Sequence, residues 1–197
     1  MAKPRLCVDI DNVVAQTDEV MRRVIREFTG GRVDFAYPDI CVFEYWKCKD
    51  ARGESITREQ WEQIHDLFSE PPCLWQIQPV PGVQSRLAEL SGKWSLHLVT
   101  SRLAKARRTT VEWLECHHFP SHCLHFVLHG EKHIVLGRFG AAVEDDRSQA
   151  ESFAQAGTLC YLIAHPWNAI QRQTERIRRV ADWQQVCADL NNEVVVP

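Results

Sequence analysis

The sequence has 197 residues, of which 45% are hydrophobic and 25% charged, and its formal net charge is −3. This length suits one main domain with a substantial core and a modest insertion. No segment approaches the roughly 18 apolar residues that a membrane-spanning helix needs, and the small negative charge gives no general attraction to nucleic acid. We therefore expect a small-molecule partner, with neither a membrane nor nucleic acid involved; the oligomeric state is unknown at this stage.

The amino-terminal segment and the cysteines both indicate a cytoplasmic protein. Residues 1–11 lack the apolar region and the small-residue cleavage site of a secretory signal. The eight cysteines are widely spaced and form no Cys-x-x-Cys pair, so free thiols are expected in place of a disulfide framework.

Five apolar runs have the composition of buried β-strands. The expected strands are residues 5–11, 95–100, 123–128, 141–144 and 158–163. Helical patterns lie between the later runs, at residues 104–117, 131–136 and 147–156. Connections of this length fit right-handed crossovers between parallel strands. The pattern predicts an α/β fold, a Rossmann-like parallel sheet with helices on both faces.

The first connection is far longer than a crossover needs, which indicates an inserted cap. We assign residues 15–81 to a small, mainly helical cap inserted after the first strand, and residues 1–14 and 82–197 to the core. Helices are expected in the cap at residues 18–29 and 58–68, the second opened by a capping box of Thr57 and Gln60. Pro71 and Pro72 are expected to end it, and the core resumes with a helix from Gly82.

Two carboxylates follow the first strand, separated by one residue. Residues two apart on a strand face the same side, so Asp9 and Asp11 are expected to project together at the carboxyl end of the sheet, where open α/β sheets bind ligands. Two like charges this close need a counter-charge, and carboxylate oxygens suit Mg²⁺. On its own, a pair of this kind more often marks two solvated acids in a turn.

Polar residues follow the later strands as well. Thr100, Ser101 and Arg102 follow the second expected strand, and the acidic cluster Glu144, Asp145 and Asp146 ends another. Lys132 lies at the start of a short expected helix, where an ammonium group and helix N–H groups can meet a phosphate. Lys105 is a second candidate, but it is expected on a solvated helix.

In this order the residues resemble the four motifs of the haloacid dehalogenase superfamily of phosphohydrolases, with the insertion at the position of a C1-type cap. The segments 79–82, 110–114, 165–168 and 179–183 further resemble the 5'(3')-deoxyribonucleotidase-like branch and its uncharacterised bacterial members. Asn12 departs from the pattern, since the superfamily most often has Gly there.

The resemblance implies a mechanism and a set of site residues. Asp9 would be the nucleophile that forms an aspartyl-phosphate, and Asp11 the general acid/base. Mg²⁺ would be held by the Asp9 carboxylate, the Asp11 backbone carbonyl and Asp145, with Asp146 in the outer shell. The choice of Asp145 among the three acids depends on the strand register. The phosphoryl oxygens would be bound by Thr100, the Ser101 backbone and Lys132.

Three other features have less specific interpretations. The cap aromatics form either the cap's own core or a platform that stacks a nucleobase; the substrate-binding candidates are Phe43, Tyr45, Trp46 and Arg102. The Cys- and His-rich segment 116–133 has no spacing that closes a tetrahedral zinc site, so we expect no specific metal there. The charge run at residues 172–179 is interpreted as a solvated surface segment.

The functional prediction is a Mg²⁺-dependent hydrolase of small phosphate monoesters, with a 5'-nucleotidase or deoxyribonucleotidase as its narrower form. One alternative is a phosphate- or nucleotide-binding regulatory module that does not turn over. Another is a phosphotransferase of the same superfamily. Asp11 favours the enzyme, because a module that only holds phosphate has no use for a second carboxylate as acid/base.

Overall fold

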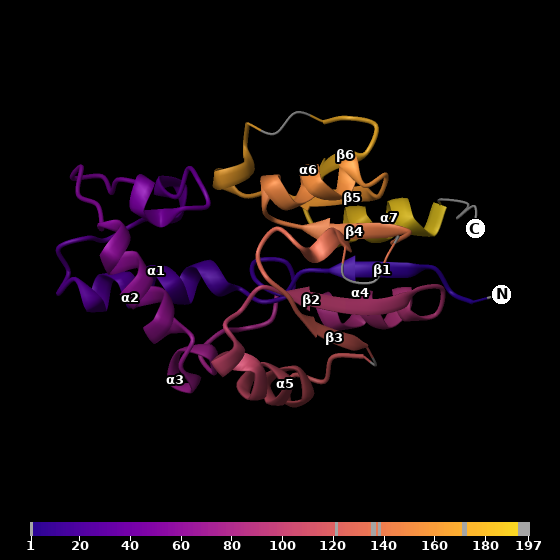
Figure 1. Cartoon of the computed structure of the whole chain (residues 1–197), viewed down its shortest axis with the longest axis horizontal. Helices are drawn as coiled ribbons and strands as arrows, with labels where there is room; N and C mark the ends of the chain where they lie inside the picture. Colours follow the sequence, from indigo (N-terminus) through magenta and orange to yellow (C-terminus); the bar gives the residue numbers. More distant parts are fainter. Residues whose placement is uncertain (1, 121, 135–136, 138, 171–172, 193–197) are drawn as a thin grey trace.

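The computed structural model describes residues 2–120, 122–134, 137, 139–170 and 173–192 and contains a six-stranded parallel sheet (Figure 1). The strands are β1 (Arg5–Val8), β2 (Ser95–Thr100), β3 (Cys123–Phe126), β4 (Ala141–Glu144), β5 (Leu159–Ile163) and β6 (Ile177–Val180). Their order is β3-β2-β1-β4-β5-β6. Val8 is in register with Leu98 of β2 and Val143 of β4, so the carboxyl end of β1 lies between those of its two neighbours.

Helices cover both faces of the sheet, as the sequence predicts. They are α4 (Val83–Ser91), α5 (Arg107–Cys116), α6 (Arg147–Gln155) and α7 (Trp183–Asn192). Alternate residues of β1 point to opposite faces. Leu6 and Val8 belong to a core that includes buried residues of α4, α5 and α7, whereas Cys7 packs in a second core with Phe153 of α6.

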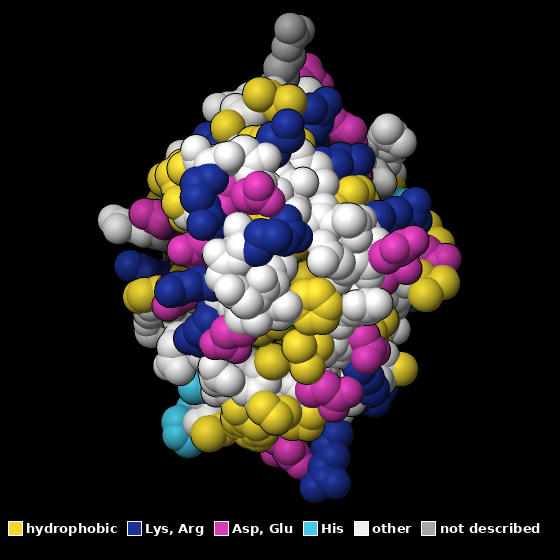
Figure 2. Space-filling model, turned by 90° about the vertical axis from the view of Figure 1, so that its left-hand side faces the viewer, with side chains coloured by type: hydrophobic (Ala, Val, Ile, Leu, Met, Phe, Trp, Pro, Cys, Tyr) yellow, Lys and Arg dark blue, Asp and Glu magenta, His cyan; other side chains and the backbone are white. Residues whose placement is uncertain are grey.

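The long insertion lies beyond the carboxyl ends of the strands (Figure 1). It comprises α1 (Thr17–Phe28), 3₁₀ turns at Tyr37–Asp39 and Tyr45–Lys47, α2 (Arg58–Phe68) and α3 (Pro71–Leu74). The chain leaves and returns at one place, where Ala15 forms an antiparallel bridge with Pro79. Figure 2 views this end of the molecule and shows basic, acidic and apolar side chains interspersed over its surface.

Local sequence signals explain how the insertion is built. The expected capping box opens α2, because the Thr57 hydroxyl accepts from the Gln60 N–H at 3.1 Å and the Gln60 side chain accepts from the Thr57 N–H at 3.0 Å. The predicted bounds of this helix, residues 58–68, are confirmed, since it ends at Phe68, before the two prolines. Pro71 then opens the short helix α3, because proline suits the first turn of a helix, where its missing N–H is not needed.

Other boundaries differ from the expectations. β1 ends at Val8, three residues earlier than predicted, and β3 ends at Phe126. The helix expected at residues 131–136 is a single 3₁₀ turn, Lys132–Ile134; residues 135 and 136 lie outside the described part. The interpretation of residues 172–179 as a solvated segment is wrong for its end, since Ile177 begins β6 and is buried.

Two expectations from composition can be compared directly with the structure. All eight cysteines are free thiols. Among the described residues, no helix combines the length and the apolar character required to cross a bilayer.

Candidate active site

Asp9 lies directly after β1 and is held in place by the neighbouring strand β4 and by the turn that follows. Its backbone N–H donates to the Val143 carbonyl at 3.0 Å, and its Oδ1 accepts from the Ile10 N–H at 2.7 Å. In the turn, Asn12 has a φ of 58°, a left-handed conformation that asparagine tolerates better than most residues. The departure from glycine at this position therefore preserves the shape of the turn.

Lys132 connects the ends of β1 and β4. Its Nζ lies 2.8 Å from Asp9 Oδ1 and 3.0 Å from Glu144 Oε1, and its side chain is 4% exposed. Burial lowers the pKa of this ammonium group, but the two carboxylates outweigh burial and raise the pKa above its usual value. Lys105, the competing candidate, instead pairs with Asp66 and Glu70 of the cap. Of the two lysines, Lys132 is therefore the one beside the predicted nucleophile.

The acidic cluster after β4 divides into three different environments. Glu144 is fully buried against Lys132, and Asp145 Oδ2 accepts from Asn12 Nδ2 at 3.1 Å. Asp146 caps α6, where its Oδ1 accepts from the Ser148 N–H at 2.7 Å. The Asp146 carboxylate thus serves as a helix cap, whereas the Asp145 carboxylate lies close to Asp9.

Oxygen atoms of Asp9, Glu144 and Asp145 lie within 4.8 Å of one another, and all three residues are buried. Burial, followed by the charge of Asp9, raises the pKa of Asp145 well above its usual value. A divalent cation relieves this repulsion, and carboxylate oxygens are suitable ligands for Mg²⁺. The donor set therefore fits the metal expected from the sequence, with Glu144 as an additional nearby carboxylate.

Asp11 has cationic and hydroxyl partners of its own. The Arg102 guanidinium donates to Asp11 from Nε at 3.0 Å and from an Nη atom at 2.7 Å, and the Thr17 hydroxyl donates at 2.6 Å. Burial raises the pKa of Asp11, but Arg102 and then Thr17 outweigh it and hold the pKa below its ordinary value. Arg102, a predicted substrate-binding residue, is therefore directed at Asp11 and also donates to Thr110.

Two hydroxyl groups lie at the end of β2, because Thr100 is its last residue and Ser101 follows it. Thr100 is fully buried, and its Oγ1 accepts from the Arg102 N–H at 3.2 Å. Ser101 Oγ is buried and has no hydrogen-bond partner among the described residues, although Ser101 lines the cavity in front of Asp9. A buried hydroxyl without a partner costs free energy, so a ligand oxygen at this place would satisfy it.

Two segments from the carboxyl-terminal part of the core brace the catalytic loops. The Asp145 carbonyl accepts from Trp167 Nε1 at 3.2 Å and from Asn168 Nδ2 at 2.9 Å. His165 Nε2 donates to the Asn12 carbonyl at 2.9 Å, and Trp183 Nε1 donates to the Val13 carbonyl at 2.7 Å. The side chains of the sequence segments 165–168 and 179–183 thus hold the loops after β1 and β4 in place.

A cavity of about 450 Å³ lies between this edge of the sheet and the cap. Asp9, Asp11, Lys132 and Asp145 line its floor, and its other walls include Phe43, Tyr45, Trp46, Trp61, His65 and His129. The sequence reasoning missed the two histidines, which only the folded chain brings to the cavity. The arrangement places an apolar, aromatic chamber next to a strongly charged floor.

The cap aromatics lie in two different environments. Tyr45 is buried, stacks on Trp61 with ring centroids 5.1 Å apart, and donates from its hydroxyl to Asp18. Phe43 is 41% exposed and stacks at 6.1 Å on His129 of the core. Tyr45 is thus part of the cap's core, whereas Phe43 presents a ring to the cavity.

Fold and site together define the class of protein. A parallel α/β sheet with strand-end acids, a buried lysine and an inserted cap is the architecture of the haloacid dehalogenase-like hydrolases, which include phosphatases. Residues 3–194 match the family described as "5' nucleotidase, deoxy (Pyrimidine), cytosolic type C protein", and the chain belongs to this family of phosphatases. No curated protein matches the sequence significantly.

Solved structures share the fold at low sequence identity. A haloacid dehalogenase-like hydrolase from Streptococcus pneumoniae superposes with a TM-score of 0.68 at 14% identity, covering 95% of this chain and 98% of the other. CbbY from Rhodobacter sphaeroides in complex with phosphate gives 0.63 at 11% identity, covering 94% and 96%. A hydrolase of the same superfamily from Deinococcus radiodurans, with bound phosphate and sodium, gives 0.63 at 11% identity, covering 95% of each chain.

Proposed function

We propose that this protein hydrolyses nucleoside monophosphates in a Mg²⁺-dependent reaction that proceeds through a phosphorylated Asp9. The observation that supports it most is the pairing of a lysine-held Asp9 with Asp11 on the floor of a cavity that also has aromatic walls. With Mg²⁺ bound, the charged floor suits a phosphate group, and an exposed ring such as Phe43 suits a base. The family description, which refers to deoxynucleotides, favours the same substrate class.

In the first step, an Asp9 carboxylate oxygen attacks phosphorus while the bond from phosphorus to the ester oxygen breaks. Asp11 gives its proton to the departing alkoxide. In the second step, Asp11 takes a proton from water, the water oxygen attacks phosphorus, and the bond to Asp9 breaks to release inorganic phosphate. Arg102 stabilises the ionised Asp11 that the second step requires.

The remaining polar groups act on the transferring phosphoryl group. Lys132, the Thr100 hydroxyl and the Ser101 hydroxyl are proposed to bind its oxygens. Mg²⁺ would be held by the Asp9 carboxylate, the Asp11 carbonyl and Asp145. Its role when bound is to neutralise negative charge on the phosphoryl group.

The test is a screen of phosphate monoesters with Mg²⁺, covering deoxyribonucleotides, ribonucleotides and sugar phosphates. Asp9→Asn serves as the blank, and Asp34→Asn, which changes an exposed aspartate of the cap, is the matched control. We expect release of phosphate from nucleotides by the wild type and the control only. Full activity of Asp9→Asn would overturn the mechanism, and a preference for sugar phosphates would overturn the substrate class.

Two further measurements distinguish hydrolysis from the alternatives. A phosphorylated Asp9 that persists for hours without release of phosphate would instead indicate a regulatory module. Addition of an alcohol to the assay tests for a phosphotransferase, because a transferase forms a new ester in preference to inorganic phosphate. We expect inorganic phosphate to be the main product both without and with the added alcohol.

A further inference from the structure

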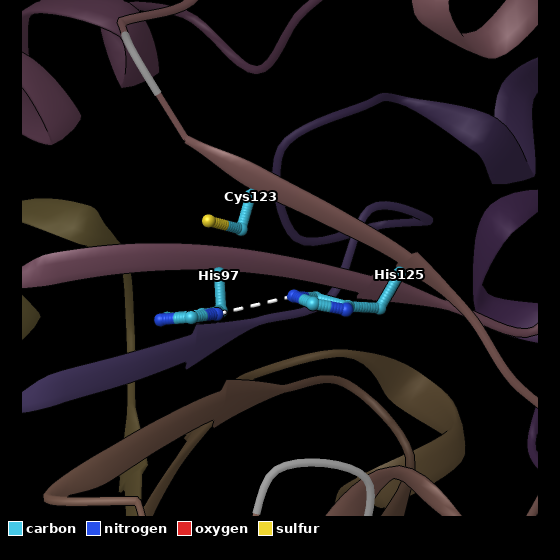
Figure 3. A group of neighbouring side chains, drawn as sticks. All are labelled: His97, Cys123 and His125. Carbon is cyan, nitrogen blue, oxygen red and sulfur yellow. Dashed lines mark hydrogen bonds between the residues drawn. The ribbon is translucent and has the colours of Figure 1, made fainter.

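A second group of side chains of metal-ligand type, His97, Cys123 and His125, lies on β2 and β3 (Figure 3). His97 is in register with Cys123, and Val99 with His125, so the three side chains share one face of the sheet. One ring nitrogen of each histidine and the Cys123 sulfur all lie within 4.8 Å of one another. None of these residues lines the active-site cavity.

The two histidines are already close to the spacing of metal ligands. His97 Nδ1 lies 3.1 Å from His125 Nε2. Two nitrogens bound to one tetrahedral Zn²⁺, at about 2.0–2.1 Å each, are about 3.4 Å apart. The nitrogens therefore need to separate by only a few tenths of an ångström, and rotation of the exposed Cys123 side chain can bring its sulfur to the same point.

His97 also has the support that metal-binding histidines have in known sites. Its Nε2 lies 3.2 Å from the Ser95 hydroxyl, on the side of the ring away from His125. A metal-bound histidine commonly donates its other N–H to an oxygen acceptor, which fixes the ring's orientation. The edge of the His97 ring also faces Phe139, with centroids 5.9 Å apart and an interplanar angle of 75°.

We propose that His97, Cys123 and His125 bind one Zn²⁺ ion, with water as the fourth ligand, and thereby tie the edge strand β3 to β2. One thiolate and two imidazoles favour a borderline-soft transition metal over Mg²⁺, which prefers oxygen ligands. Three protein ligands leave a fourth position, and the exposure of Cys123 gives solvent access to it. The site is independent of the proposed phosphatase reaction.

The first experiment uses Co²⁺ as a spectroscopic probe on tag-free protein with Mg²⁺ in excess, so that the acidic site is occupied. We expect one equivalent of Co²⁺ to produce a thiolate-to-cobalt charge-transfer band and the visible bands of tetrahedral cobalt. Cys123→Ser should abolish the charge-transfer band, whereas Cys116→Ser, which changes another exposed cysteine, should retain it. Absence of the band in the wild type, or its retention in Cys123→Ser, would overturn the proposal.

The second experiment measures Zn²⁺ affinity by calorimetry under the same conditions. His125→Ala should weaken binding by more than about tenfold, because even an outer-shell partner of a metal ligand is worth 10–100-fold. His122→Ala is the matched control, since His122 bonds the Pro120 carbonyl and lies outside the cluster. Equal affinity of His125→Ala and the wild type would count against the site. His97 is buried, so these tests avoid changing it.

A third experiment needs no variant. Cys41, Cys116 and Cys123 are the exposed cysteines of the chain, so each should react with a thiol-alkylating reagent. Zn²⁺ should slow alkylation of Cys123 alone, with the other two as internal controls read by mass spectrometry of peptides. Equal protection of all three, or of none, would contradict a specific site. Asp9→Asn should abolish phosphatase activity and change none of these three readouts of metal binding. Failure of the zinc proposal can therefore be distinguished from failure of the proposed function.

Discussion

The ion pair between Arg102 and Asp11 allows us to predict how much stability is lost when Arg102 is replaced. Replacing Arg102 with methionine keeps the length and apolar volume of the side chain but removes the guanidinium. Breaking a buried ion pair by removing one partner costs about 3–5 kcal/mol. The Asp11 side chain is 27% exposed and keeps its bond from Thr17, so water replaces part of the loss. We expect Arg102→Met to lower the free energy of unfolding by about 2 kcal/mol at neutral pH.

The pH dependence of this loss identifies its cause. The pKa of Asp11 is lowered in the folded protein, so the pair stabilises the fold above the ordinary aspartate pKa of about 3.9. That contribution disappears as the pH falls through the folded-state pKa. The difference between Arg102→Met and the wild type should therefore be largest at neutral pH and shrink in acid.

Urea denaturation over this pH range measures the difference, with Arg108→Met as the control. Arg108 is an exposed arginine that pairs with Glu112 one helical turn away, so its replacement should cause no measurable change. In the activity assay, loss of the guanidinium should raise the pKa of Asp11 and move the alkaline fall of kcat/KM to higher pH. A loss of stability below about 0.5 kcal/mol, or one independent of pH, would refute the reasoning.

Four further outcomes are expected. Phe43→Ala should raise KM for a nucleotide by at least about fivefold and leave a sugar phosphate unaffected, whereas Trp75→Ala, equally exposed but outside the cavity, should change neither. Lys132→Met should lower kcat by about 10²–10³-fold in steady-state assays of folded protein. Asp145→Asn should raise the Mg²⁺ concentration for half-maximal activity by about tenfold or more, and an unchanged Mg²⁺ titration would contradict its assignment. Gly140→Ala should lower the unfolding free energy by about 1–3 kcal/mol, since the new Cβ lies 2.8 Å from the Trp94 ring; unchanged urea unfolding would contradict this.

The site could be predicted as far as strand ends determine it. In a parallel sheet all carboxyl ends meet at one edge, so polar residues after separate strands come together without any knowledge of side-chain packing. That reasoning brings Asp9, Thr100 and Asp145 to one edge, and in the structure they lie at the carboxyl ends of the neighbouring strands β1, β2 and β4. It does not give hydrogen-bond partners, which depend on side-chain torsions. For this reason the contacts from Lys132 to Glu144 and from Arg102 to Asp11 were not foreseen.

One strand of the sheet, β6, is not predicted from the sequence. β6 has four residues, two of which are arginines, and its assignment depends on hydrogen bonds to β5 that its own composition does not indicate. The expectation of no specific metal in residues 116–133 depends on spacing within that segment alone. The structure places His97, from the neighbouring strand, beside Cys123 and His125. Local spacing cannot reveal a neighbour that the register of the sheet supplies.

The charges at the catalytic edge explain why a divalent cation matters to the proposed reaction. Five carboxyl groups lie at the end of β4 or directly after β1 and β4, at Asp9, Asp11, Glu144, Asp145 and Asp146. Among the described residues, two lysine or arginine side chains pair with this group, Lys132 and Arg102, which leaves a formal excess of three negative charges when the carboxyl groups are ionised. A phosphate monoester dianion entering this site is repelled by the excess negative charge, because the two cations are already paired with carboxylates. Phosphate binding and Mg²⁺ binding at this edge must therefore favour each other.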